Sequence, residues 1–208
     1  LCDNIGTPYY PSDDSFTFDL DPTGLNLSSS GYLVSSSVNI TPSSANYGSA
    51  TSFETVSGSA GSGDLVITVT DADHSGCNIS VNLIDPTPNP NIANVIQPNE
   101  CGGDGTIVIG GLISGVQYDI VYDNLPLTDI LIPGVTANGS GEISISLPEG
   151  AYTNIRAKKT NDNCIGGSLS ATLTEPANPT YTISGSNPTS CSGSEGSFTL
   201  SGVNNNTT

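Results

Sequence analysis

Hydrophobic and polar residues alternate with a period of two along most of the chain. In the stretch VQYDIVYD, the apolar side chains of Val116, Tyr118, Ile120 and Tyr122 fall on one face. The stretches DLVITVT and GEISISL repeat the pattern, and none shows a helical period. Because successive side chains of a β-strand point to opposite faces, each stretch predicts a strand with one buried face. Clusters of Gly, Pro and Asn separate these strands roughly every 8–12 residues, which is typical of β-sandwiches.

The pattern therefore predicts an all-β fold made of tandem sandwiches of the immunoglobulin or fibronectin-III type. Composition agrees with this prediction, because the chain is rich in Ser, Thr, Asn and Gly, which disfavour helix interiors. Hydrophobic residues make up 35% of the 208 residues, which is enough to form a core.

An internal repeat divides the chain. The segment CGGDGTIVIGGL, which begins at Cys101, recurs as CSGSEGSFTLSGV from Cys191, and the Pro/Asn-rich stretches DPTPNPN and EPANPT mark two linkers. The predicted domains are 1–86, a sandwich repeat of a first type, and 87–177, a repeat of a second type. Residues 178–208 are predicted to be the first strands of a further, truncated repeat, so the chain reads as a fragment of a tandem array.

The five cysteines follow the same division. Cys2 and Cys77 fall in the first unit, and Cys101 and Cys164 fall in the second. The predicted disulfides therefore join Cys2 to Cys77 and Cys101 to Cys164, while Cys191 stays unpaired because its partner would lie beyond the end of the chain. Disulfides indicate a compartment outside the cytoplasm. The alternative is that all five are buried thiols.

Charge limits the classes of partner. The chain has 20 acidic and 3 basic residues, with a formal net charge of −17. Such a surface repels phosphate backbones and anionic lipids, so nucleic-acid binding is not expected. Membrane insertion is not expected either, because no apolar run reaches the roughly 18 residues of a spanning helix.

Pairs of Asp residues in loops are the candidates for a Ca²⁺ site, because Ca²⁺ takes six to eight oxygen ligands. Asp71 and Asp73 are the first choice, followed by Asp13 and Asp14. No EF-hand loop is present, and the alternative is that these residues bond to their own backbone in turns.

The three basic residues, Arg156, Lys158 and Lys159, all lie in the stretch IRAKK. We expect them to protect an edge strand against pairing with another sheet. The alternative is that they dock against an acidic neighbouring domain or a second chain.

Enzymatic activity is not expected. The one histidine, His74, lies in a turn beside a cysteine assigned to a disulfide, which provides neither a nucleophile with its base nor a zinc ligand set. Aromatic residues make up 6% of the chain without Trp, which disfavours a sugar-cleaving cleft. The stretch LPEGAY predicts a tyrosine corner, in which the Tyr152 hydroxyl bonds to the upstream backbone.

The sequence resembles repeats of the giant cell-surface adhesins of the Bacteroidota, of the SprB-like gliding-motility kind. In the first unit the resemblance rests on DNIGTPYYPSDDSFTFDLDPTG (Asp3–Gly24), YGSATSFE (Tyr47–Glu54) and GDLVITVTDADHSGC (Gly63–Cys77). In the second unit it rests on GVQYDIVYDN and LPEGAYTNIRAKKTNDNC.

This resemblance implies an extracellular protein on the cell surface, exported by the type 9 secretion system. It implies adhesion or gliding as the function, with surface polymers or glycans and the secretion and gliding machinery as partners. It also implies O-glycosylation of Ser or Thr after Asp, for which Ser15 is an imperfect match. Two further hypotheses are a structural subunit of a filament, built by packing between copies, and a carbohydrate-binding module.

Overall fold

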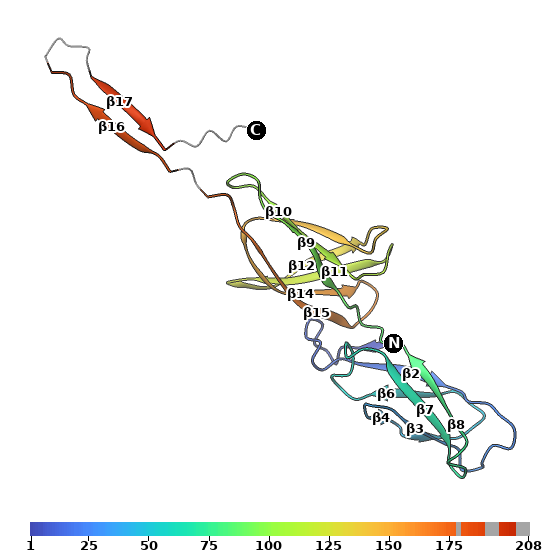
Figure 1. Ribbon diagram of the computed structural model, residues 1–208. Helices are drawn as coiled ribbons and strands as arrows, with labels where there is room; N and C mark the ends of the chain where they lie inside the picture. Colours follow the sequence, from blue (N-terminus) through green and yellow to red (C-terminus); the bar gives the residue numbers. More distant parts are fainter. Residues whose placement is uncertain (178–179, 190–195, 203–208) are drawn as a thin grey trace.

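The computed structural model describes residues 1–177, 180–189 and 196–202. These residues form two β-sandwiches followed by a β-hairpin, arranged one after another along an elongated molecule (Figure 1). The prediction of an all-β sandwich fold is confirmed. Over the described ranges, no helix is long and apolar enough to cross a membrane.

The first sandwich consists of two antiparallel four-stranded sheets, with the strand orders β1-β2-β6-β4 and β5-β3-β7-β8. Its strands are β1 (Cys2–Asp3), β2 (Ser15–Leu20), β3 (Tyr32–Ser35), β4 (Ile40–Thr41), β5 (Ser44–Ala45), β6 (Thr51–Thr55), β7 (Leu65–Asp71) and β8 (Asn78–Leu83).

The alternating pattern decides which side chains enter this first core. On β7, Leu65, Ile67 and Val69 are buried, while the intervening Val66 is 57% exposed. Aromatic side chains fill the space between the sheets, with Phe53 packed 6.2 Å from Tyr32 between ring centroids. Burying such large apolar side chains is the main stabilising contribution to a domain of this size.

The second sandwich combines a three-stranded sheet, β13-β10-β9, with a four-stranded sheet, β12-β11-β14-β15. Its strands are β9 (Asn91–Ile96), β10 (Gly105–Gly110), β11 (Gln117–Asn124), β12 (Leu127–Thr136), β13 (Ile143–Leu147), β14 (Gly150–Lys159) and β15 (Ile165–Leu173).

The predicted alternation is confirmed in the second core. Ile143 and Ile145 of β13 are buried, as are Tyr118 and Ile120 of β11. The predicted tyrosine corner is also confirmed, because the Tyr152 hydroxyl donates a hydrogen bond to the Pro148 carbonyl at 2.8 Å. This bond ties β14 to the loop that precedes it.

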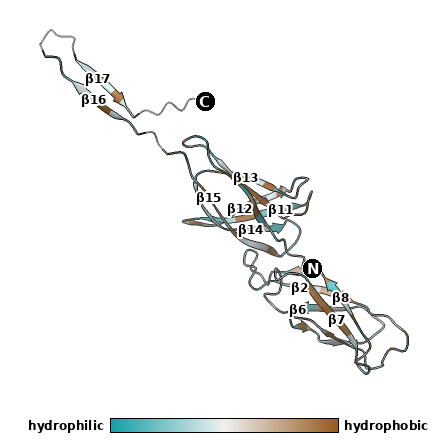
Figure 2. Cartoon of the chain, viewed as in Figure 1, coloured by the Kyte–Doolittle hydropathy of each residue, from teal (hydrophilic) through white to brown (hydrophobic). Residues whose placement is uncertain are grey.

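A hairpin of β16 (Thr182–Ser186) and β17 (Ser197–Ser201) follows the second sandwich. Within the described ranges it pairs with no other strand. Ile183 and Leu200 lie opposite each other on one face of the hairpin, and both are exposed (Figure 2). The predicted boundaries after residues 86 and 177 fall between these three groups of strands.

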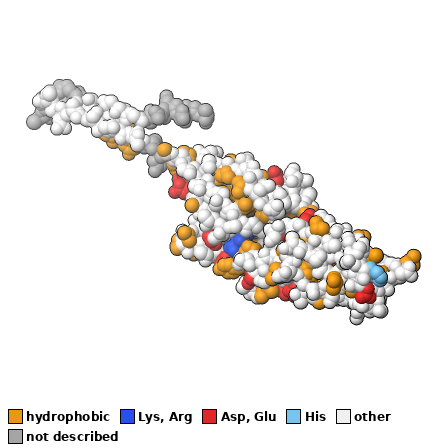
Figure 3. Space-filling model, turned by 60° about the horizontal axis from the view of Figure 1, so that its bottom comes forward, with side chains coloured by type: hydrophobic (Ala, Val, Ile, Leu, Met, Phe, Trp, Pro, Cys, Tyr) orange, Lys and Arg blue, Asp and Glu red, His pale blue; other side chains and the backbone are white. Residues whose placement is uncertain are grey.

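On the face shown in Figure 3 charged side chains are sparse, and those of Lys and Arg lie at one place near the middle of the molecule. All three belong to β14, which lies in the second sandwich. Two of these residues, Arg156 and Lys159, contact the first sandwich or the linker, so they lie at the junction between the two sandwiches.

Candidate functional site: the junction between the two sandwiches

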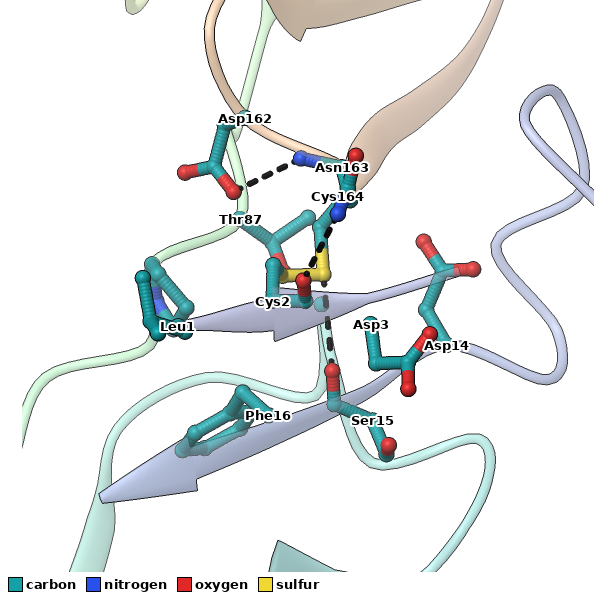
Figure 4. Close-up of a disulfide and its surroundings, with 12 residues drawn as sticks. Leu1, Cys2, Asp3, Asp14, Ser15, Phe16, Thr87, Asp162, Asn163 and Cys164 are labelled. Carbon is teal, nitrogen blue, oxygen red and sulfur yellow. Dashed lines mark hydrogen bonds between the residues drawn. A yellow bond between two sulfur atoms is a disulfide. The ribbon is translucent and has the colours of Figure 1, made fainter. Parts of the chain in front are cut away.

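A disulfide joins the two sandwiches covalently. It links Cys2 in β1 to Cys164, which directly precedes β15, with a Cα–Cα distance of 5.4 Å and a sequence separation of 162 (Figure 4). Cys164 is completely buried and packs into the core of the first sandwich, although its strand belongs to the second. Asn163 adds a hydrogen bond from its Nδ2 to the Cys2 carbonyl at 3.3 Å.

Both predicted disulfide pairings are therefore wrong. Cys77 is exposed and lies in the turn after β7, at the end of the first sandwich that faces away from the junction. Cys2 lies at the junction, so the seven-residue length of β7 separates the two cysteines. Cys101 lies beyond the other end of the second sandwich from Cys164, with its Sγ 3.8 Å from the Pro176 carbonyl. The cysteines grouped by sequence thus lie at opposite ends of their sandwiches, too far apart for a disulfide.

The prediction for Cys191 falls outside the described residues. Cysteine spacing does not identify the observed pairing. Spacing groups the cysteines within each unit, whereas the observed bond joins one unit to the other.

Arg156 is the second link between the sandwiches. Its side chain is buried, and its guanidinium donates one hydrogen bond across the junction to the Tyr9 carbonyl. The same guanidinium makes an ion pair with Asp129 at 2.7 Å and lies over the ring of Tyr10, 6.0 Å from its centroid. A planar group with five donors suits a site that combines a carbonyl, a carboxylate and an aromatic face.

Irregularities in the second sandwich position this guanidinium. The ladders of β14 shift register between Val121 and Asp123 on one side and between Tyr152 and Ile155 on the other. Asn154 and Asp129 adopt left-handed backbone conformations, with φ of 49° and 53°. Bulges of this kind redirect side chains and are common beside functional sites.

Asp123 completes the cluster from below. Its carboxylate accepts hydrogen bonds from Asn154 Nδ2 at 2.6 Å and from the Asp129 backbone amide at 2.8 Å. These bonds lower the pKa of Asp123 below its usual range, and the bond from Asn154 has the largest effect. The positive charge of Arg156 makes a smaller contribution in the same direction. The buried guanidinium is thus compensated by two carboxylates, one of which is held by hydrogen bonds of its own.

The basic residues do not protect an edge strand as expected. β14 lies inside its sheet, between β11 and β15. Lys159 donates a hydrogen bond from Nζ to the Pro86 carbonyl in the linker at 3.0 Å, and Lys158 pairs with Asp119 at 3.6 Å on the same sheet. Arg156 and Lys159 therefore match the alternative, docking against the preceding unit and its linker.

The linker itself is fixed at both ends. Asp85 Oδ2 accepts the backbone amides of Gly61 and Gly63 at 2.8 and 3.0 Å, which attaches the linker to the first sandwich. On the other side, a Cβ at Gly166 would overlap the Pro88 carbonyl oxygen, so β15 approaches the linker closely only because it has glycine there.

A cavity of about 670 Å³ remains at this junction, open to solvent. It is lined by the 60–64 loop, the linker and the start of β15. Its two carboxylates, Asp64 and Asp85, both accept backbone amides, so they serve the fold of the junction.

Asp14 is buried beside the disulfide. Its Oδ2 accepts the backbone amide of Ile165 at 3.3 Å, while its Oδ1 has no hydrogen-bond partner. The pKa of Asp14 is raised to about 6, chiefly by burial and to a smaller extent by the nearby Asp13 and Asp3, while the Ile165 amide acts in the opposite direction. Figure 4 shows the Asp3 and Asp14 side chains close together on the same side of the disulfide.

The expected glycosylation of Ser15 is wrong for the folded chain. Ser15 is 1% exposed, and its hydroxyl donates a hydrogen bond to Glu54 Oε1 at 2.9 Å. A transferase that acts on the folded protein would not reach this hydroxyl.

The first-choice Ca²⁺ residues lie at the other end of the first sandwich. Asp71 is buried and accepts bonds from the backbone amides of Ser28, Asp73 and His74, from the Tyr47 hydroxyl and from the His74 ring. The Ser28 amide is the largest cause that lowers the pKa of Asp71 to about 2.

The carboxylate of Asp71 therefore organises a turn, which was the alternative interpretation. Asp13 is likewise engaged, by the Thr7 hydroxyl at 2.8 Å. Across the part of the chain that the structure describes, no group of three or more His, Cys, Asp or Glu side chains could hold a metal ion. The Ca²⁺ hypothesis gains no support from this arrangement.

Comparison with known proteins adds no relative. No protein-family model matches the chain, and no curated protein matches it significantly.

Proposed function

We propose that this chain is a segment of a long extracellular adhesin, in which sandwiches joined in series hold a cell to surface polymers or glycans. The observation that carries the proposal is the locked junction. A disulfide, a buried guanidinium and a linker fixed at both ends all serve to hold two sandwiches in one arrangement. Domains of one chain otherwise move relative to each other by default.

The strand orders support the proposed sandwich type. In the first sandwich, β1, β2 and β6 take the places of immunoglobulin strands A, B and E, and β3, β7 and β8 take those of C, F and G. The short strands β4 and β5 occupy the positions of D and C′, but β4 comes before β5 in the chain, which reverses the immunoglobulin order. The order β13-β10-β9 against β12-β11-β14-β15 corresponds to the immunoglobulin arrangement without strand D. Tandem domains of this type are common in cell-surface proteins.

The disulfide also supports the proposed location. Structural disulfides persist in oxidising environments and are rare in the cytosol. An extracellular surface agrees with a net charge of −17, which keeps a β-rich chain soluble. Export by the type 9 secretion system and a role in gliding are proposed from the resemblance of the sequence alone.

A filament subunit is the second candidate, and one observation favours it. Strand β8 forms an open edge of its sheet, and its Ile79 and Val81 are 61% and 41% exposed. Both point to the core side, because they pair directly with the buried Val69 and Ile67. An open edge with apolar side chains is suited to strand addition by a neighbouring copy.

Electron microscopy of the native material, on cells and after release, separates the two candidates. Antibody fragments against the first sandwich identify this chain in the images. We expect single thin strings labelled at intervals. Ordered filaments with a constant subunit rise would contradict the adhesin proposal and establish the filament.

A further inference from the structure

The first residues of the chain lie next to the inter-sandwich disulfide. Leu1 and Cys2 lie at the junction, in the middle of the two sandwiches, and not at the outer end of the first one (Figure 1). The Leu1 nitrogen donates a hydrogen bond to the Thr17 carbonyl at 2.9 Å, which holds Leu1 beside β2. From Cys164, β15 runs away from the junction toward the hairpin β16–β17 (Figure 1).

We infer that the Cys2–Cys164 disulfide removes residues 3–163 from the path of force when the chain is pulled at its two ends. Tension passes from Leu1 to Cys2, through the two sulfur atoms to Cys164, and along β15 to the C-terminal part. The inference deepens the proposed function and rests on it in one respect, namely that the chain bears tension in use.

The lengths of the two routes decide which one is taut. The disulfide connects Cα atoms 5.4 Å apart, whereas the chain between the same residues has a separation of 162. Fully extended, that chain would span roughly 550 Å, at 3.3–3.6 Å per residue. The long route stays slack for as long as the short covalent route is intact, so its folded structure carries no load.

Within the second sandwich, β15 is the loaded element. Force enters at its first end, at Cys164, and leaves after its other end, at Leu173, so tension runs along one strand that is already extended. Its neighbour in the sheet, β14, lies inside the slack loop and bears none. Neither sandwich therefore has a sheet that must be unzipped or sheared for the molecule to transmit force, whereas the hairpin β16–β17, which lies in the path, is pulled open from its Thr182–Ser201 pair.

The first sandwich is then a branch of the stalk rather than a link in it. All of its strands after Cys2 lie inside the slack loop, including the surface around β8. It stays folded at tensions that unfold an ordinary in-line domain. This arrangement suits a module that displays an adhesive surface from a strand under load.

Single-molecule force spectroscopy of the full chain tests the inference. The handles are joined to the two termini by peptide ligation, so that no thiol is modified. In oxidising buffer we expect a total extension below roughly 160 Å, the length of the residues outside the loop. Addition of a reductant under constant force should then release up to roughly 550 Å more.

Two variants serve as controls. Cys2→Ser should exceed the 160 Å limit without reductant, whereas Cys77→Ser should behave as the wild type, because Cys77 is an exposed thiol far from the junction. Unfolding steps beyond that limit in the oxidised wild type would overturn the inference. The measurement involves no ligand, so the adhesin proposal can fail in microscopy while the force path stands, and the reverse.

Discussion

A single buried carboxyl, that of Asp14, makes the junction sensitive to pH. Its Oδ1 has no partner, and two further carboxylates, Asp3 and Asp13, lie near enough to raise its pKa. Because the pKa of the folded state, about 6, lies above the ordinary value of 3.8, the folded protein binds the proton more tightly than the unfolded chain. Ionised Asp14 therefore destabilises the fold above pH 6, and this cost disappears as the pH falls through 6 toward 4.

We therefore expect Asp14→Asn to change how stability depends on pH. As the pH falls from 7.5 to 4.5, protonation of Asp14 should add roughly 1–2 kcal/mol to the unfolding free energy of the wild type. The variant lacks this group, so its unfolding free energy should fall behind that of the wild type by the same amount. Urea unfolding followed by tyrosine fluorescence measures this difference. Asp21→Asn, at an exposed site, is the matched control and should show no such trend. Parallel curves for Asp14→Asn and the wild type would contradict the assigned role.

The residue scale also shows what the sequence could not predict. Asp14 and Asp71 were identified as loop acids, but whether each carboxylate met a cation, an amide or an apolar wall depended on the residues packed against it. Asp14 meets Ile165, which lies in another unit of the chain. Local sequence carries no information about such a neighbour.

At the scale of the element, β14 combines predictable and unpredictable features. Its alternation places Ile155 and Ala157 in the core, as the pattern indicates for buried strands. The bulge around Asn154 breaks that alternation and brings Arg156 under the first sandwich. Alternation indicates which face is buried in a regular ladder, but a bulge depends on how two strands pair, which one strand does not specify.

Strand β11 shows the same limit. Val121 lies on the opposite face from the core residues Ile120 and Tyr122, yet it is completely buried. It pairs directly with Arg156, which reaches the Tyr9 loop of the first sandwich. An alternating pattern predicts that one face of a strand is buried and the other is exposed to solvent. In this sheet the first sandwich covers part of the face that the pattern assigns to solvent.

Replacing Arg156 should loosen the junction more than replacing its neighbour. Arg156→Met leaves the carboxylates of Asp129 and Asp123 without their cation, at an expected cost of about 3 kcal/mol. Lys158→Met removes a partly buried pair with Asp119 at 3.6 Å, but Asp119 keeps its hydrogen bonds from the Gly134 amide and the Thr160 hydroxyl, so the expected cost is only about 1 kcal/mol. Hydrogen exchange should rise around Tyr9 and Tyr10 in the first variant only. Equal destabilisation and unchanged exchange would show that the guanidinium does not hold the loop.

At the scale of the whole molecule, the all-β class and the division into strand groups could be predicted, because periodicity, repeats and linkers are local signals. The covalent link between the units could not. The prediction assumed that each unit closes its own disulfide, as small secreted domains commonly do. In this chain both sandwiches have enough buried apolar side chains to form without one, and the disulfide joins them instead.

Reduction should therefore affect the whole molecule and not one sandwich. In the chain-entropy model, closing a loop of this length stabilises the fold by roughly 5 kcal/mol. Calorimetry should show a lower Tm with reductant and a separation into two transitions. An unchanged thermogram after confirmed reduction would mean that the noncovalent contacts of the junction suffice.

The far placement of Cys77 has a consequence for the order in which the protein matures. A chain that emerges from its N-terminus exposes Cys2 first and Cys77 next, whereas Cys164 follows only after a separation of 162 residues. The nearest early partner of Cys2 is thus the wrong one. Once the first sandwich folds, β7 holds Cys77 at the opposite end from Cys2, so that mispairing is closed off and Cys2 stays available. Folding of the first sandwich before oxidation therefore favours the correct bond, because it takes Cys77 out of the competition for Cys2.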